Sequence, residues 1–375
     1  MISIFPVCLK ENAASMSRIR CTETLLYQDF HGHLSLFCYE FRLSGGEKGF
    51  PYMKEWNEGM VHMSRVSGVD HAGIGVRDWE AMKSFYIDMM GFNRVLGEMP
   101  EDDHEPIHAL LRTSHAVHSA IHLCHERGGI SVALFHATAP IPRPIRRDFR
   151  YGDIGLTKMT MSVSDVDHLY RDLHKSMNFC SEPKSVIIPG WEEHRFAYCK
   201  DPEGNLIEFV SGSLARARNG FGGVHWLGVG VTDLERSRSF YQRQLGFDRI
   251  VVENHHAFSG LVDEVSGSAG TNVRSCLLAN GNGNGMIELF EVFNPRGRSI
   301  PFGVQWGDFG YLQVCLSGVD VRNMTAYCEA EDLEPIAPAQ TIGDPEHGGA
   351  FMYLRDPDGI PIEYVVFSHR AEGDE

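Results

Sequence analysis

The chain of 375 residues lacks any hydrophobic run of about 18 residues, the length that a membrane-spanning helix requires. Residues 1–9 have neither the basic start nor the small-residue cleavage site of a secretory signal peptide. We therefore expect a cytoplasmic protein that does not enter a membrane.

Disulfide motifs and basic clusters are also missing. The nine cysteines are odd in number and form no Cys-x-x-Cys motif, so we expect no disulfide framework. The net charge of −16, with Lys and Arg mostly scattered, argues against binding to nucleic acid. With 43% hydrophobic and 22% charged residues, the chain is long enough for two domains with buried cores.

The sequence does contain a duplication. Gly68–Asp78 aligns without gaps on Gly223–Asp233, at an offset of 155 residues. The same offset carries Tyr198–Glu208, which contains Asp-Pro-Glu-Gly, onto Tyr353–Glu363, which contains Asp-Pro-Asp-Gly. Such a repeat indicates a tandem architecture. We divide the chain into an N-terminal extension of unknown role (1–62), a first half (63–215) and a second half (220–370).

Each half divides again into two modules of one order. Residues 69–76 alternate small and apolar residues as a strand does, and Asp78 can cap a helix that ends near Gly91. Three strands follow, with a turn at Arg127–Gly129. The sequence thus predicts an α+β fold of four βαβββ modules.

This order, with a His on the first strand and a closing Asp-Pro-x-Gly-x-x-Ile-Glu strand, resembles the vicinal oxygen chelate superfamily. The superfamily includes glyoxalase I, bleomycin resistance proteins and type I extradiol dioxygenases. The resemblance covers roughly residues 68–368 and implies that the modules pair into two open β-barrel-like cups. It implies less about activity, because one fold hosts lyases, epimerases, dioxygenases and metal-free binding proteins.

The resemblance also implies a divalent metal ion, held inside a cup by residues from the first and last strands of two modules. The matching first-strand residues are His71, Lys158, Trp226 and Gln313, and the matching last-strand residues are Ala133, Glu208, Glu288 and Glu363. Imidazole, carboxylate and amide oxygen can bind such an ion, whereas Lys, Trp and Ala are not ligands of this kind.

Which of these residues meet depends on how the modules pair. If the first pairs with the fourth, as we favour, then His71, Gln313 and Glu363 form one metal site. It is similar to the facial triad of non-haem iron oxygenases, with Gln in place of one His. Lys158 would then lie between two carboxylates of the other cup and replace a metal there. If the first module pairs with the second, and the third with the fourth, then Glu288 replaces His71 as the ligand beside Gln313 and Glu363.

A further pattern lies in residues 346–363, which are similar to the extradiol dioxygenase signature except that the His-to-Tyr spacing is one residue short. By this resemblance His347 would act as acid and base, and Tyr353 would hydrogen-bond the substrate. Alternatively, Tyr353 has a structural role, because Tyr198 occupies the same place in the first repeat. We interpret the histidines between residues 115 and 125 as surface residues, with one of them, His122, alternatively lining the first-module cup.

By this resemblance we expect the chain to be a metal-dependent dioxygenase of the extradiol type, which cleaves a catechol- or hydroquinone-like ring with O2 in the catabolism of aromatic compounds. Fe(II) is the favoured metal, with Zn, Ni, Co or Mn as alternatives. Gln313 instead favours a lyase or epimerase that acts on a 2-oxo substrate through an enediolate, with Glu288 moving the proton. A third interpretation is a metal-free protein that binds a small molecule, because Lys158 and Trp226 stand where metal ligands would be expected. The partner is a small molecule in each case, and a homo-oligomer is an open alternative.

Overall fold

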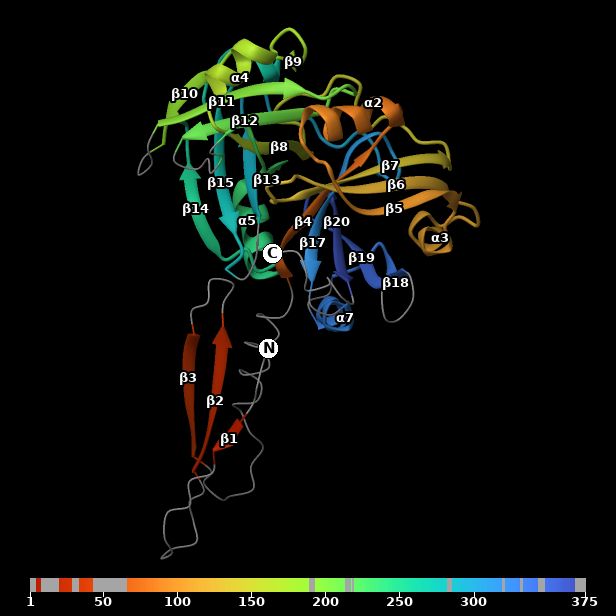
Figure 1. Ribbon diagram of the computed structural model, residues 1–375, viewed down its shortest axis with the longest axis vertical. Coiled ribbons are helices and arrows are strands. Elements are labelled where there is room, and N and C mark those ends of the chain that lie inside the picture. The colour runs from red at the N-terminus through yellow and green to blue at the C-terminus, as the bar shows by residue number, and fades with distance from the viewer. Residues whose placement is uncertain are drawn as a thin grey trace, which may run out of the picture. The chain divides into compact units, whose positions relative to one another are not determined.

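The computed structural model divides into two compact units, Met1–Glu58 and Gly59–Glu375 (Figure 1). The structure describes residues 5–7, 20–28, 34–42, 66–188, 193–212, 217, 219–281, 285–318, 321–330, 333–342 and 348–367. The first unit contains an antiparallel sheet of β1 (Phe5–Val7), β2 (Arg20–Gln28) and β3 (Leu34–Arg42). In the part of the chain that is described, no helix has the length and apolar character to cross a membrane.

The second unit contains two large sheets, and each is made by two modules. An eight-stranded sheet has the order β18-β19-β20-β17-β4-β7-β6-β5, which joins the fourth module to the first. Its first-module strands are β4 (Val66–Gly75), β5 (Arg94–Asp103), β6 (Val117–Cys124) and β7 (Ser131–Ala139). Its fourth-module strands are β17 (Gly310–Gly318), β18 (Ala337–Ile342), β19 (Gly349–Arg355) and β20 (Pro361–Phe367).

A nine-stranded sheet joins the second and third modules in the order β10-β11-β12-β8-β13-β16-β15-β14, with β9 paired to β11. The second module supplies β8 (Gly155–Val163), β9 (Asn178–Phe179), β10 (Lys184–Ile187), β11 (Glu193–Lys200) and β12 (Leu206–Gly212). The third supplies β13 (Phe221–Gly230), β14 (Arg249–Asn254), β15 (Val273–Ala279) and β16 (Met286–Val292). The pairing of the first module with the fourth is therefore confirmed, and the alternative pairing is wrong.

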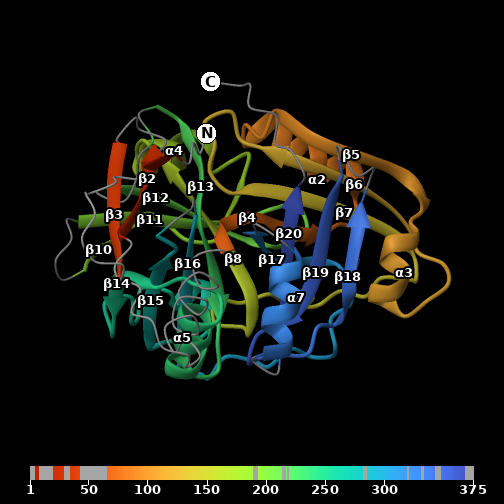
Figure 2. The same cartoon turned by 90° about the horizontal axis from the view of Figure 1, so that it is seen from below.

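The helix that follows the first strand begins at the predicted cap, Asp78, and two further helices begin at an aspartate in the same way. Asp78, Asp165 and Asp233 each accept a hydrogen bond from a backbone N–H three residues later, which satisfies one free donor of the first turn. The helices are α2 (Trp79–Ser84), which continues as the π-helix η1 (Phe85–Met89), α3 (Glu105–Leu111), α4 (Val166–Leu173), α5 (Leu234–Arg243), α6 (Asp263–Ser266) and α7 (Val321–Ala330). In Figure 2, α7 lies over the strands of the fourth module.

The two faces of the central strand β4 have different surroundings. On β4, Ala72 and Ile74 belong to the main apolar core, together with Met82 and Tyr86 from the α2–η1 helix. Because successive side chains point to opposite faces of a strand, the residues that alternate with Ala72 and Ile74 face the concave side of the sheet. His71 is one of these. The first strands β4 and β17 pair with each other at the centre of the sheet, so both modules contribute to one cup.

Candidate metal centre

The cup of the first and fourth modules brings together His71, Gln313 and Glu363, the three ligands that the favoured pairing predicts. Nε2 of His71 lies 3.2 Å from Oε2 of Glu363. Nε2 of Gln313 donates a hydrogen bond of 2.6 Å to the same oxygen. The three residues are 5%, 1% and 7% exposed, respectively. They are therefore clustered in a buried place, and their role as ligands stays a prediction.

Small residues leave room for the long side chain of Gln313. On β4, Gly73 is paired with Gln313, and a Cβ atom at Gly73 would lie only 2.6 Å from Cγ of Gln313. Ala133 is paired with Gly73 from the other side, on β7. The methyl group of Ala133 offers no donor atom, so this corner of the cup leaves an ion accessible to a substrate.

Asp70 orients the imidazole of His71, and sequence reasoning missed it. Nδ1 of His71 lies 3.0 Å from Oδ1 of Asp70, and the Ser317 hydroxyl donates to Oδ2 at 2.8 Å. A carboxylate on Nδ1 directs Nε2 toward an ion, as is common in protein metal sites. Burial lowers the pKa of His71, but the carboxylates of Asp70 and Glu363 outweigh burial and raise this pKa to about 9.

The cup fits a divalent ion on two observations. Among the described residues, Nε2 of His71 is one of the few buried side-chain atoms without a well-aligned hydrogen-bond partner. In addition, one ligand atom each of His71, Cys315 and Glu363 lie within 4.8 Å of one another. Imidazole and carboxylate suit borderline divalent ions, and a thiol suits the softer ones. Cys315 is a second residue that sequence reasoning missed.

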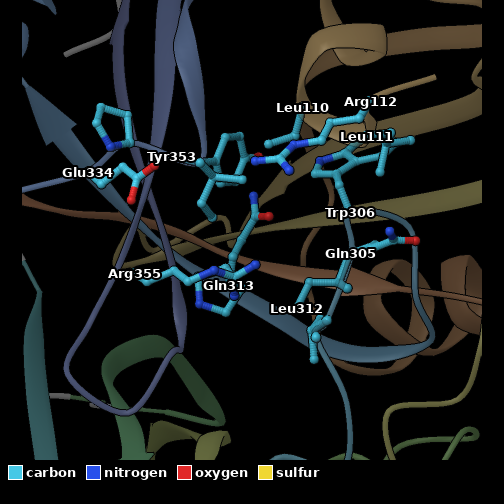
Figure 3. Close-up of a pocket in the computed structure, with 15 residues that line it drawn as sticks. Leu110, Leu111, Arg112, Gln305, Trp306, Leu312, Gln313, Glu334, Tyr353 and Arg355 are labelled. Atoms are coloured by element: carbon cyan, nitrogen blue, oxygen red, sulfur yellow. The ribbon is translucent and has the colours of Figure 1, made fainter. Parts of the chain in front are cut away.

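A cavity of about 380 Å³ opens beside this centre (Figure 3). Gln313 and Tyr353 line it, and both side chains point into the space that Figure 3 shows. The Tyr353 hydroxyl also contacts Gln313 and Glu363, and burial raises its pKa well above the usual value. Leu110 at the end of α3 and Trp306 of the segment before β17 form an apolar part of the wall. The cavity thus adjoins the cluster of predicted ligands through Gln313 and Tyr353.

The cup of the second and third modules is closed by buried charges. The Lys158 ammonium contacts Glu208 and lies 2.8 Å from Oε2 of Glu288. Trp226 stands at the position equivalent to His71, and its indole N–H donates to Glu288 at 3.2 Å. The predicted lysine between two carboxylates is therefore present. Glu288 belongs to this cup, which removes it from the centre of His71.

Comparison with known proteins agrees with this geometry. Residues 68–209 and 223–364 each match the family model described as Glyoxalase/Bleomycin resistance protein/Dioxygenase superfamily. The chain belongs to this superfamily. The two matches confirm the predicted duplication and the vicinal oxygen chelate fold, in which each half of the chain contributes one module to each cup.

Solved structures of the superfamily show the same fold. A variant of glyoxalase I from Zea mays has a TM-score of 0.51 and 16% identity, and the alignment covers 83% of this chain and 96% of that one. A putative dioxygenase from Bacillus subtilis has a TM-score of 0.50 and 13% identity over 81% of this chain and 86% of that one. At these identities the likeness concerns the fold alone. The curated proteins give no sequence match to the chain.

The structure describes one of the two predicted catalytic residues, Tyr353, and does not describe the other, His347. His347 lies outside the described residues, so its role stays a prediction. Tyr353 lies at the cavity and contacts Glu363. Its equivalent in the other cup, Tyr198, donates a hydrogen bond of 2.7 Å to Glu208. The shared contact shows that this tyrosine orients the last-strand glutamate in both cups, whatever else Tyr353 does.

The interpretation of all histidines in residues 115–125 as surface residues is wrong. His118 and His125 are 1% and 2% exposed, and the ring of His125 lies against that of Phe92, at 5.6 Å between ring centroids. His118 packs against Trp306, at 4.3 Å between ring centroids. His122 lies in the cup, as the alternative had it, with its ring 4.8 Å from that of His71.

Proposed function

We propose that the chain is a cytoplasmic, metal-dependent dioxygenase of the extradiol type, which cleaves a catechol- or hydroquinone-like ring with O2 in the catabolism of aromatic compounds. The proposal rests on the convergence of His71, Gln313 and Glu363 beside the cavity of about 380 Å³. One carboxylate and two neutral donors leave positions for two vicinal substrate oxygens and for O2. Fe(II) is the metal that suits this chemistry.

Within this proposal, the chain's own residues bind and orient the substrate. Leu110 and Trp306 would pack against the aromatic ring and exclude water from it. The Tyr353 hydroxyl would hydrogen-bond a substrate oxygen, and His347 would serve as acid and base. Asp70 holds His71 in one orientation. A bound divalent ion would supply Lewis acidity toward the substrate oxygens and, as iron, redox capacity toward O2.

Anaerobic purification followed by metal analysis and oxygen uptake with a panel of catechols and hydroquinones tests the proposal. We expect bound iron and ring-dependent uptake, and His71→Ala should abolish both. Trp226→Phe changes the equivalent position of the other cup and should leave uptake intact, which provides the matched control. Zinc, nickel or cobalt without oxygen uptake would refute the dioxygenase. Absence of any bound metal would leave the metal-free binding protein.

Gln313 favours a second function, a metal-dependent lyase or isomerase that acts on a 2-oxo substrate through an enediolate. Its amide is a weaker donor than the imidazole of the iron facial triad. Glu288 cannot move the proton in this reaction, because it is held by Lys158 in the other cup. Glu363 is the carboxylate that this site offers. Anaerobic incubation of 2-oxo compounds in D2O, followed by NMR, would detect exchange of the proton next to the carbonyl. No exchange with any bound metal would refute this function.

A further inference from the structure

Cys315 stands in the middle of a row of side chains that crosses three strands. It is paired with His71 of β4 on one side and with Glu363 of β20 on the other. Directly paired residues of neighbouring strands point to the same face of a sheet. One ligand atom each of Cys315, His71 and Glu363 lie within 4.8 Å of one another, and Cys315 is 0% exposed. The thiol is therefore as close to the centre as the two strongest ligands.

The amide group of Gln313 faces Glu363 with its nitrogen and not with its oxygen, which is the atom that binds metal ions. Its Nε2 atom donates to Oε2 of Glu363 at 2.6 Å. An amide N–H is a donor with no free electron pair for a cation, and an amide binds metal through its oxygen. In this orientation Gln313 restrains the carboxylate of Glu363. A third protein ligand can then come from another residue of the cup.

A second observation concerns the imidazole of His71, which faces the same space as the thiol. Nε2 of His71 is buried and has no well-aligned hydrogen-bond partner among the described residues, and it lies 3.2 Å from Oε2 of Glu363. Nδ1 of the same ring is already held by Asp70. Nε2 of His71 and the carboxylate of Glu363 thus both face the space that the thiol shares.

We propose that Cys315 is the third protein ligand of the ion, bound as a thiolate, and that Gln313 positions Glu363. On binding, the S–H bond breaks, a sulfur–metal bond forms and the proton leaves to solvent, with no change of oxidation state. The inference rests on the metal site of the proposed function. A thiolate is a softer and stronger donor than an amide, so this ligand set selects Fe(II), Co(II), Ni(II) or Zn(II) over Mg(II) or Mn(II).

The other cup supplies the competing explanation and also the matched variant. Thr160 occupies the position equivalent to Cys315, and its hydroxyl donates to Oε2 of Glu208 at 2.7 Å. The thiol of Cys315 could in the same way serve Glu363 only as a hydrogen-bond donor. Cys315→Thr keeps such a donor and removes the thiolate, so it separates the two roles.

The test is an anaerobic titration of the metal-free full chain with Co(II), followed by absorbance and by equilibrium dialysis. We expect a near-ultraviolet thiolate-to-cobalt charge-transfer band that saturates at one Co(II) per chain. Cys315→Thr should lose the band and bind Co(II) at least about tenfold more weakly. Gln313→Leu should keep the band. Cys276→Ala removes a buried thiol of the other sheet and should also keep it.

Each outcome bears on one of two claims. Co(II) binding without the band, or a band that persists in Cys315→Thr, overturns thiolate ligation while the metal site of the proposed function stands. Loss of the band in Gln313→Leu with Cys315 intact also overturns it. No Co(II) binding by the natural chain at all would remove the metal site itself. If Cys315→Thr does not fold, as judged by circular dichroism, Cys315→Ser takes its place.

Discussion

Lys158 of the second and third modules' cup should be replaceable by a metal ion. Lys158 is 2% exposed, and its ammonium contacts Glu208 and Glu288. Burial lowers the pKa of Lys158, but the two carboxylates outweigh burial and raise it, so the ammonium stays charged. Lys158→Gln would leave two buried carboxylates without a cation. Breaking a buried ion pair on one side costs about 3–5 kcal/mol.

The amide introduced by Lys158→Gln is the residue type that the other cup carries at the equivalent position, Gln313. Together with Glu208 and Glu288 it offers three oxygen donors for a divalent ion. An ion that binds only the folded state at 100 times its dissociation constant adds about 2.7 kcal/mol of stability. Added Mn(II) should therefore restore most of the lost free energy of unfolding, and the variant should bind one ion more than the natural chain.

Urea unfolding followed by tryptophan fluorescence, with chelator or with Mn(II), measures both effects. With a slope of about 3 kcal/mol per molar urea, the midpoint should fall by about 1–2 M in chelator and recover in Mn(II). The control, Lys158→Gln with Glu288→Gln, removes one of the two charges and should lose less stability and show little recovery. If the urea midpoint of Lys158→Gln in chelator lies within about 0.3 M of that of the natural chain, the Lys158 ammonium does not stabilise the buried carboxylates. The free energy lost with a buried ion pair would shift the midpoint by more than about 0.3 M.

Three further predictions concern the first and fourth modules' cup. Asp70→Asn should weaken metal affinity about 10–100-fold in chelator competition, and unchanged affinity would contradict the role of Asp70. Because the pKa of His71 is raised to about 9, an ion must displace the proton of His71 below that pH, and a Cys315 ligand must lose its own proton as well. Metal affinity should therefore rise about tenfold per pH unit below pH 9 if only His71 loses a proton, and about a hundredfold if Cys315 binds as a thiolate. An affinity independent of pH would show that His71 is not a ligand. Tyr353→Phe and Tyr198→Phe should each cost about 1.5–3 kcal/mol of stability in urea unfolding, but only Tyr353→Phe should lower kcat/KM. Equal kcat/KM values for the two variants would leave Tyr353 with a structural role alone.

The repeat made most of the fold predictable, because an offset of 155 residues identifies equivalent positions without knowledge of their contacts. Under the favoured pairing of modules, the difference between Lys158 and Gln313 predicted an ion pair in one cup and a ligand set in the other. The pairing of modules was open, since neither hydrophobic pattern nor length distinguishes which first strand lies beside β4. Only the hydrogen-bonded register of β4 with β17 decides it.

Sequence reasoning did not identify Asp70 and Cys315 as parts of the site, for two different physical reasons. Asp70 directly precedes His71, and regular alternation would put the two side chains on opposite faces of the strand. The register shifts between Cys315 and Leu316, however, so Asp70 is the extra residue of a β-bulge and turns toward the imidazole. Cys315 stands in an apolar run, where a thiol usually behaves as a small hydrophobic residue. Its partners across β4 and β20 are invisible in the sequence.

The balance of buried charge distinguishes the two cups, although their strand orders are equivalent. In the cup of Lys158, the ammonium already compensates the carboxylates, and Trp226 fills the place where His71 stands in the other. In the cup of His71, no fixed cation faces Glu363 among the described residues, apart from the imidazole itself when it is protonated. A buried carboxylate without a fixed counter-charge favours a bound cation. One ion per chain should then link β4, near the start of the second unit, to β20 at its end, so metal removal should loosen both terminal modules together.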